Sequence, residues 1–290
     1  MIYENLEQLI GNTPVLKHNG VYVKLEGYNP GGSIKDRIAL NMITSMLKNN
    51  EIKLTDTICE PTSGNTGIGI AMVCAYLKMR CVIVMPENMS EERIKAIKAY
   101  NAEIILTDKK DGIKGAIAYA NKLAQEKGYI VLDQFSNKYN PLAHEKTALE
   151  IVKDFKHIDY FVAGIGTGGT ISGVAKVLKE HFKDIKIVGV EPEESPIITK
   201  NIAGPHKIQG IGTGFIPKTL NLSLVDEVMR IKSDDALSKV NSLASEGLFL
   251  GISSACNILA SEEILRQNPG KVVVTISPDS GLKYLSVINV

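Results

Sequence analysis

The sequence predicts an α/β protein with two lobes, each built on a mostly parallel twisted sheet with helices on both faces. Two observations lead to this class. Short apolar stretches typical of buried strands alternate with longer stretches at helical spacing along most of the chain. The 290 residues also exceed the usual size of one domain, and hydrophobic residues make up 44% of them, which is enough for a sizeable core.

The first half of the chain alternates between strand and helix patterns. A short helix pattern precedes a turn at residues 11–14, and residues 21–26 alternate like a strand. Three strand-and-helix pairs follow, at residues 57–60 and 67–77, 81–85 and 90–100, and 103–106 and 112–127. We expect residues 1–140 to form the N-terminal lobe, with its first strand free to join the other sheet.

A polar loop from Gln134 to Pro141 separates the halves, and a second α/β set follows it. Strand patterns cover residues 159–163, 186–190, 224–231 and 272–276, and helix patterns cover residues 170–181 and the stretches from Asp234 and Ser253. We expect residues 141–290 to form the C-terminal lobe. Active sites in open α/β sheets lie beyond the carboxyl ends of strands, so chemistry is expected in the loops after these strands.

The composition excludes several classes of partner. Lysine and arginine number 33 against 32 acidic residues, without basic tract or acidic tail, so neither nucleic acid nor membrane is an expected partner. The start, residues 1–7, lacks a basic region followed by an apolar one, and we expect a cytoplasmic protein. The four cysteines and five histidines are dispersed, which favours reduced, buried thiols and no metal centre.

The stretch from Pro30 to Arg37 delivers a lysine, Lys35, into the first turn of a predicted helix. Ser33 and Asp36 form a capping-box pattern that fixes the start of this helix. The helix macrodipole disfavours an ammonium group there, whereas a neutral amine is tolerated. Lys35 is therefore a candidate nucleophile, although a solvated helix lysine is the simpler alternative for this stretch alone.

Two further loops each join a strand to a helix. Residues 61–67 combine hydroxyls, an amide and two glycines at a helix start, which would suit a substrate carboxylate as well as an ordinary connection. Residues 164–170 combine four glycines with two threonines, which would suit a phosphate. They also match the dinucleotide fingerprint, with Glu191 placed to bind a ribose, so an NAD-dependent dehydrogenase is a competing hypothesis.

A helix-start lysine, a phosphate loop and a carboxylate loop together suit pyridoxal 5'-phosphate (PLP) acting on an amino acid. PLP needs an amine for its aldehyde, an anchor for its phosphate and a site for the substrate carboxylate. The dinucleotide interpretation leaves the lysine turn and the carboxylate loop without a function. We therefore expect PLP in the cleft between the lobes.

Motifs along nearly the whole chain resemble those of the cysteine synthases, or O-acetylserine sulfhydrylases, a family of PLP-dependent enzymes with fold type II, similar to the tryptophan synthase β subunit. They occur in the family's order at residues 10–14, 29–37, 62–69, 85–90, 166–173, 204–212 and 251–254.

The resemblance implies a set of site residues. Lys35 would hold PLP as a Schiff base and move the substrate α-proton. Cofactor binding would also involve Asn65 at the ring oxygen, Ser253 at the pyridine nitrogen and, at the phosphate, Gly166, Thr167, Gly168, Gly169 and Thr170. Substrate binding would involve Thr62, Ser63, Thr66, Gln134 and Gly210.

The resemblance also implies a reaction, a β-replacement forming L-cysteine from O-acetyl-L-serine and sulfide through an α-aminoacrylate. A close alternative is an L-cysteine lyase or β-replacement enzyme of the same fold, which releases hydrogen sulfide and gives serine or lanthionine. A catalytically silent binding homologue is a further alternative. The resemblance implies a homodimer with serine acetyltransferase as a partner.

Some positions depart from the family's usual pattern, and others have simpler explanations. Residues 147–150 lack the usual Thr-Thr-Gly-Pro before the glutamate, Thr213 replaces an alanine and Ala255 a glycine. Because Thr213 is expected near the substrate, the leaving group and nucleophile stay open. We expect Asp279 to form a turn, with an approach to the ring end of the cofactor as the alternative. We expect His144 and His206 to make structural hydrogen bonds and Cys256 to pack in the core.

Overall fold

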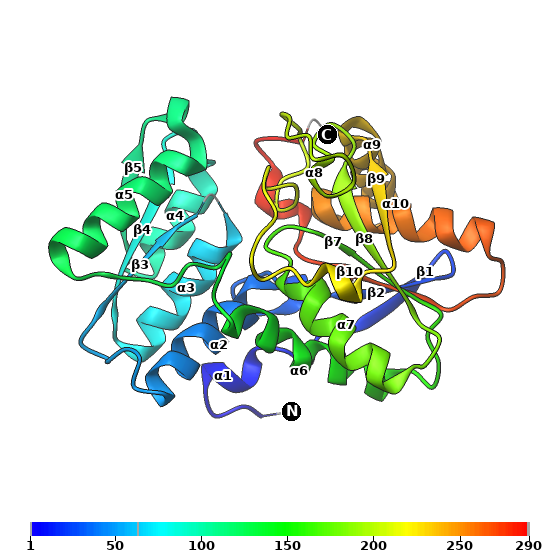
Figure 1. The fold of residues 1–290 in the computed structure, drawn as a ribbon, viewed down its shortest axis with the longest axis horizontal. Helices are drawn as coiled ribbons and strands as arrows, with labels where there is room; N and C mark the ends of the chain where they lie inside the picture. The colour runs from blue at the N-terminus through cyan, green and yellow to red at the C-terminus, as the bar shows by residue number, and fades with distance from the viewer. Residues whose placement is uncertain (1, 63, 289–290) are drawn as a thin grey trace.

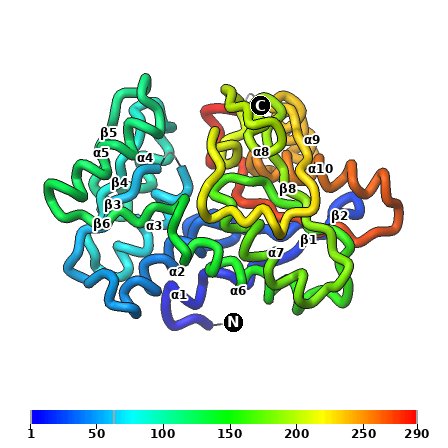
Figure 2. Tube along the Cα trace, viewed as in Figure 1, coloured from blue at the N-terminus to red at the C-terminus, as the bar shows by residue number. Residues whose placement is uncertain are grey.

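The computed structural model describes residues 2–62 and 64–288 and shows two sheets side by side, each with helices packed against it (Figure 1). Figure 2 traces the chain from its start below the centre of the view to its end near the top. The α/β architecture with two mostly parallel sheets is therefore confirmed.

Within the described residues the smaller sheet has four parallel strands in the order β5-β4-β3-β6. Side chains of β4 alternate between two buried faces: Ile83 and Met85 face one apolar cluster, and Val82 and Val84 face another. Helices α2, α3 and α4 cover the first face and α5 covers the second. The elements are β3 (Thr57–Pro61), β4 (Arg80–Pro86), β5 (Glu103–Thr107), β6 (Ile130–Val131), α2 (Lys35–Lys48), α3 (Asn65–Leu77), α4 (Glu91–Ala99) and α5 (Gly112–Lys127).

The larger sheet has six strands among the described residues, in the order β1-β2-β10-β7-β8-β9, and only the β1–β2 pair within it is antiparallel. Helices α6 and α7 cover one face, and α9 and α10 cover the other. The elements are β1 (Val15–His18), β2 (Val21–Leu25), β7 (Tyr160–Gly164), β8 (Lys186–Pro192), β9 (Glu227–Ile231), β10 (Val273–Ser277), α6 (Tyr139–Asp154), α7 (Gly169–His181), α9 (Ser233–Ser245) and α10 (Ile252–Gln267).

Shorter elements complete the chain. They are α1 (Leu6–Leu9), α8 (Ile197–Lys200) and the 3₁₀ turns Glu26–Tyr28, Lys109–Asp111, Leu222–Leu224 and Gly281–Tyr284. In residues 2–62 and 64–288, no helix combines the length and apolarity that crossing a bilayer requires. All four cysteines are buried, and none forms a disulfide bond.

The N-terminal strand pair lies in the larger sheet although it precedes the smaller sheet in sequence. Strand β2 pairs in parallel with β10, with Tyr22 opposite Val274 and Leu25 opposite Ser277. The chain therefore crosses from the larger sheet to the smaller one between β2 and β3 and returns with α6. The division into lobes at residue 140 stays a prediction.

A buried ionic network fixes the start of α2. Arg37 donates to both carboxylate oxygens of Glu26, at 2.6 and 2.8 Å, and to both of Glu150, at 2.7 and 2.8 Å. Lys24 lies 2.9 Å from Glu150. Burial by itself raises the pKa of Glu150, but hydrogen bonds from Arg37 outweigh it and lower that pKa to about 2. Since breaking a buried ion pair costs roughly 3–5 kcal/mol, this network holds β2, α2 and α6 together.

The expected polar loop at residues 134–141 is shorter than predicted, because α6 begins at Tyr139. The Asn137 side chain accepts a hydrogen bond from the Tyr139 N–H at 2.9 Å, which favours a helix start. Pro141 suggested a turn, yet it is the third residue of α6, where the missing N–H has no intrahelical partner to lose.

Candidate active site

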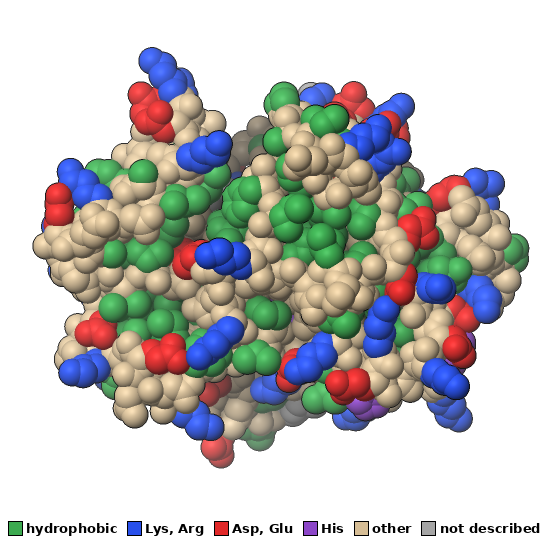
Figure 3. Space-filling model, viewed as in Figure 1, with side chains coloured by type: hydrophobic (Ala, Val, Ile, Leu, Met, Phe, Trp, Pro, Cys, Tyr) green, Lys and Arg blue, Asp and Glu red, His purple; other side chains and the backbone are tan. Residues whose placement is uncertain are grey.

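A cavity of about 410 Å³ is walled by loops of both sheets and contains most of the predicted site residues. Figure 3 shows the surface hollowed between the two parts of the molecule at the top of the view. Ser63 lies outside the described residues, and Gly169 stands behind the wall, where an added Cβ would lie 1.9 Å from Asn140 Oδ1. The predicted residues that line the cavity are Lys35, Thr62, Asn65, Thr66, Gln134, Gly166, Thr167, Gly168, Thr170, Gly210 and Ser253.

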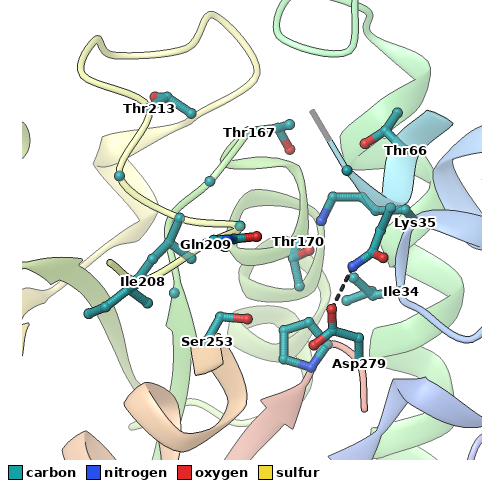
Figure 4. Close-up of a pocket in the computed structure, with 18 of the residues that line it drawn as sticks. Ile34, Lys35, Thr66, Thr167, Thr170, Ile208, Gln209, Thr213, Ser253 and Asp279 are labelled. Carbon is teal, nitrogen blue, oxygen red and sulfur yellow. Dashed lines mark hydrogen bonds between the residues drawn. The ribbon is translucent and has the colours of Figure 1, made fainter. Parts of the chain in front are cut away.

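Lys35 is the first residue of α2, and its amine points toward the middle of the pocket (Figure 4). Ser33 Oγ accepts a hydrogen bond from the Lys35 N–H at 3.2 Å, as a helix start requires. The capping-box prediction is wrong in its second half, because the Asp36 carboxylate accepts from the Gly31 N–H at 2.6 Å. Asp36 thus closes the glycine turn and fixes the direction in which Lys35 leaves it.

Burial lowers the pKa of Lys35 below its ordinary value, and the carboxylate of Asp279 opposes that shift in part. A lowered pKa means a larger fraction of neutral amine at a given pH. Neutral amine is the form that condenses with an aldehyde or removes a proton. The helix-start argument from the sequence and the burial in the structure therefore agree in direction.

The carboxylate loop joins the end of β3 to the start of α3. Thr66 Oγ1 donates to Gln134 Oε1 at 2.7 Å, so the loop contacts a residue 68 positions away. The backbone around Gln134 is itself held by the buried carboxyl group of Glu60, whose oxygens accept from the Asp133 and Gln134 N–H groups at 3.0 and 3.1 Å. These contacts form a wall of hydroxyls and amides at the N-terminus of α3, where an anion is favoured.

The glycine-rich loop, residues 164–170, which the sequence analysis assigned to a phosphate, joins β7 to α7 on the opposite side of the pocket. Gly168 has φ +81°, and an added Cβ would lie 2.5 Å from Leu220 Cβ, so only glycine fits. Among the hydrogen bonds of the described residues, none uses the backbone N–H of Gly166, Thr167, Gly168 or Thr170. Several donors at the start of a 13-residue helix thus remain for an anion.

A buried histidine orients one hydroxyl of this loop. His144 Nε2 lies 3.2 Å from Thr170 Oγ1, and its Nδ1 lies 3.2 Å from Thr147 Oγ1. Burial lowers the pKa of His144 well below its ordinary value, and the charges of Arg37 and Lys35 lower it further. The ring is therefore neutral, and it fixes both threonines. The structural role expected for His144 is confirmed.

Ser253 and Gly210 close the remaining side of the pocket. Ser253 is the second residue of α10, and Figure 4 shows its hydroxyl directed toward the middle of the pocket. Gly210 has φ +97°, and its carbonyl oxygen would lie 2.3 Å from a Cβ added at Gly166. The loop at residues 204–214 therefore packs directly on the glycine-rich loop. Thr213 also lines the pocket, and its hydroxyl donates to Phe215 O at 2.8 Å.

Two further residues line the pocket: Tyr284, which the sequence analysis did not name, and Asp279, for which it favoured a turn over a place near the cofactor ring. Each is 1% exposed, and Asp279 Oδ2 accepts hydrogen bonds from Asn65 Nδ2 at 2.5 Å and from the Tyr284 hydroxyl at 2.6 Å. The prediction that Asp279 merely forms a turn was therefore wrong. One signal could have identified it, because it follows β10 by two residues, at the carboxyl end of a strand.

The sequence profile of a family described as "Pyridoxal-phosphate dependent enzyme" matches residues 6–279. The chain belongs to this family. As a pyridoxal-phosphate-dependent enzyme it is 48% identical to a cysteine synthase from Staphylococcus aureus, over 98% of this chain and 96% of that relative. The resemblance inferred from the motifs is confirmed.

Solved structures of similar enzymes agree with this assignment. A cysteine synthase from Entamoeba histolytica superposes with a TM-score of 0.95 at 40% identity, over 99% of this chain and 90% of that one. A hydrogen sulfide-producing enzyme from Fusobacterium nucleatum superposes with a TM-score of 0.94 at 45% identity, over 98% and 100% of the two chains. This pyridoxal-phosphate-dependent enzyme thus shares its fold with enzymes of both names.

The pocket fits the cofactor of the family. Lys35 supplies an amine with a lowered pKa, and the glycine-rich loop supplies backbone donors for a phosphate. The dinucleotide alternative fails at Glu191, which is buried and accepts from Ile198 N at 2.8 Å and Thr199 N at 3.1 Å. Because Glu191 caps α8, its carboxylate is not placed to bind a ribose.

Proposed function

We propose that this enzyme forms L-cysteine from O-acetyl-L-serine and sulfide by β-replacement with PLP. One observation carries the proposal: a lysine amine with a lowered pKa lies in one pocket with two separate loops suited to anions. A PLP enzyme acting on an amino acid needs one anion site for the cofactor phosphate and another for the substrate carboxylate. The cysteine synthase name of the relative at 48% identity supports this choice of substrates.

The pocket residues fall into a cofactor-binding group and a substrate-binding group. Lys35 would hold the cofactor, with Asn65 at its ring oxygen, Ser253 at its pyridine nitrogen and residues 166–170 at its phosphate. Thr62, Ser63, Thr66 and Gln134 would bind the substrate carboxylate, beside Gly210. Bound PLP supplies an electron sink for the charge left at the substrate α-carbon when its proton is removed.

In the proposed reaction the proton leaves the substrate α-carbon, and the leaving group departs from the β-carbon. Lys35 Nζ takes the proton from the substrate α-carbon, the β-carbon–oxygen bond breaks, and acetate leaves with the bond electrons. Hydrosulfide then forms the new β-carbon–sulfur bond, and Lys35 Nζ returns a proton to the α-carbon. Ser253 would offer the pyridine nitrogen a hydroxyl, which does not enforce protonation of that nitrogen as a carboxylate does. The cofactor would then be a weaker electron sink, which favours elimination.

A second candidate, an L-cysteine lyase that releases hydrogen sulfide, is favoured by two observations. The hydrogen sulfide-producing enzyme is 45% identical over 98% of this chain, and Thr213 lines the pocket near the expected substrate. The two reactions share the steps at Lys35. They differ in which group leaves the β-carbon and which one enters.

We also infer a cytoplasmic homodimer that works with a serine acetyltransferase. Leu142 and Leu149, two turns apart on α6, are 43% and 52% exposed, which offers an apolar face to a second copy. Buried, unbonded cysteines suit a reducing compartment. The acetyltransferase would supply the acetylated substrate.

Product analysis separates the two reactions. The purified enzyme is given O-acetylserine with sulfide in one reaction and L-cysteine alone in another. We expect cysteine synthesis to be faster than sulfide release, and equal or faster sulfide release would assign the enzyme as a lyase. Lys35→Ala should slow both reactions by about 10³-fold or more, whereas Lys48→Ala, at the exposed end of the same helix, should leave both unchanged.

A further inference from the structure

The proposed reaction gives no task to the buried pair Asp279 and Tyr284, although both line the pocket. Asp279 lies two residues after the end of β10, and Tyr284 lies in the 3₁₀ turn that follows. A buried carboxylate is costly unless hydrogen bonds compensate for its lost hydration, so its partners indicate what it does.

The contacts of Asp279 run from the larger sheet to the start of α3. Its Oδ2 accepts from the Tyr284 hydroxyl at 2.6 Å and from Asn65 Nδ2 at 2.5 Å, the contact marked by the dashed line in Figure 4. Its backbone is fixed as well, because the Gly251 N–H donates to Asp279 O at 3.1 Å and Ser33 forms a β-bridge with it. The carboxylate therefore stands on a rigid support.

The fixed carboxylate of Asp279 determines the orientation of the Asn65 side-chain amide. The Asn65 nitrogen donates to the carboxylate, and Asn65 Oδ1 is buried with no hydrogen-bond partner among the described residues. An amide nitrogen carries two hydrogens, so one N–H remains for a ligand after the first has been given to Asp279. An amide without this carboxylate could rotate and present its carbonyl oxygen instead.

We propose that Asp279, braced by the Tyr284 hydroxyl, is a positioning residue that keeps Asn65 as a hydrogen-bond donor toward the ring oxygen of PLP. The inference rests on the cofactor role proposed for Asn65. A donor at the ring oxygen stabilises its ionised form, which is the form that absorbs visible light in the lysine-bound cofactor. Asp279 would therefore act on the electronic state of PLP through Asn65.

A direct role at the substrate fits the contacts less well. Asp279 Oδ1 is buried, and a Cβ added at Gly251 would lie 1.9 Å from it, so this oxygen faces the start of α10 and not the open pocket. Burial raises the pKa of Asp279, and the hydrogen bonds from Tyr284 and Asn65 oppose that shift. The same two donors thus hold the carboxyl group in position and oppose its protonation.

Four variants of the PLP-loaded enzyme test this assignment. Asp279→Ala removes the acceptor, Asp279→Asn keeps one carbonyl acceptor at the same place, and Tyr284→Phe removes only the hydroxyl. The control is Tyr139→Phe, because Tyr139 is also a buried tyrosine whose hydroxyl donates to a carboxylate, Glu51, at 2.6 Å, but it does not line the pocket. Circular dichroism checks that each variant is folded.

The readouts are the ratio of visible to near-ultraviolet absorbance of the bound cofactor and the Kd of PLP. We expect Asp279→Ala to lower the ratio at least twofold and to weaken PLP binding about fivefold, the effect of losing one oriented hydrogen bond. Tyr284→Phe should shift both in the same direction by less, Asp279→Asn should restore most of each value, and Tyr139→Phe should change neither.

An unchanged ratio in folded Asp279→Ala would overturn the assignment, and so would an equal change in Tyr139→Phe. These outcomes do not depend on the overall reaction. If the wild-type enzyme shows the visible band but forms no cysteine, the proposed reaction fails while the role of Asp279 stands.

Discussion

At the scale of single residues, burial shifts the ionisable groups around the pocket in opposite directions. The pKa of Lys35 is lowered, whereas burial raises the pKa of Glu60 to about 8, although hydrogen bonds from the Gln134 and Asp133 N–H groups oppose this shift. Glu60 is 0% exposed at the end of β3 and supports the loop that carries Gln134. The protonation of Glu60 is therefore linked to the stability of the fold that holds the Gln134 loop in place.

The shift at Glu60 predicts a dependence of stability on pH. The folded state binds a proton at Glu60 between the ordinary pKa of 4.5 and about 8, where the unfolded chain does not. This contribution to stability is complete below pH 4.5 and is lost as the pH rises through about 8. We expect the thermal midpoint to fall by a few degrees between about pH 5 and pH 8.5.

Replacing the carboxyl group separates Glu60 from other causes. Glu60→Gln should flatten part of this fall, because it removes the titrating group, while Glu227→Gln, at an exposed position on β9, should leave the slope as it is. Identical slopes in the wild type and Glu60→Gln would show that Glu60 is not the source.

The sequence revealed the site residues whose signals are local. Lys35 and the glycine-rich loop were found because a turn, a helix start and a cluster of glycines are visible within ten residues. Asp279 was assigned to a turn because its partner Asn65 lies 214 positions away, and only the packing of the larger sheet on α3 brings them together. Gln134 was found through the family resemblance, since its 68-residue separation from Thr66 leaves no local trace.

At the scale of elements, the junction of β7 and α7 depends on glycine for two separate reasons. The left-handed backbone of Gly168 costs any other residue roughly 1–2 kcal/mol, and a side chain there would also strike Leu220. Among the described residues, the same backbone turn leaves the N–H groups of Gly166, Thr167, Gly168 and Thr170 without a hydrogen bond near the start of α7. Glycine at position 168 is therefore expected to matter both for the stability of the fold and for anion binding, and the two effects can be measured separately.

A matched pair of substitutions separates the effect of glycine on stability from its effect on PLP binding. Gly270 has φ +84° and nothing within 4 Å of an added Cβ, so Gly270→Ala should lose about 1–2 kcal/mol of unfolding free energy without changing the Kd of PLP. Gly168→Ala should lose more stability and weaken PLP binding at least tenfold. Urea unfolding and PLP titration check this, and equal PLP affinity in the two variants would contradict a cradle at Gly168.

Most elements were predictable because their periodicity is strong, and the exceptions have clear causes. Helix α6 was partly taken for a loop because its first turn reads Tyr-Asn-Pro, which is typical of a turn but also tolerated at a helix start. Strand β6 has two residues, too few for a period to show. Strand β1 is half-buried and short, so its alternation is faint.

At the scale of the whole molecule, the pocket is walled by residues from both sheets. Lys35, Asn65 and Thr66 begin helices that cover the smaller sheet, whereas Gly166, Thr170 and Ser253 belong to the larger one. A cofactor held at both sides therefore links the two sheets. Its binding free energy adds to the stability of both.

Removing the cofactor should therefore destabilise the whole chain. Free PLP at one hundred times its Kd adds about 2.7 kcal/mol to stability, so we expect the PLP-free enzyme to unfold about 5–10 °C lower in differential scanning calorimetry. Lys35→Ala, which binds PLP only without the covalent bond, should show a smaller difference. Hydrogen exchange should slow in segments of both sheets when PLP is added, and slowing in only one would contradict the linkage.

The pairing of β2 with β10 has a consequence for how the protein is made. Residues 21–25 leave the ribosome long before their parallel neighbour at residues 273–277 is synthesised. The N–H group of Ile34, which precedes Lys35, likewise needs Pro278 O as its acceptor, at 2.8 Å. A nascent chain therefore cannot assemble this centre until residues 273–278 have been synthesised, and a product truncated before residue 273 should be inactive however well its other parts fold.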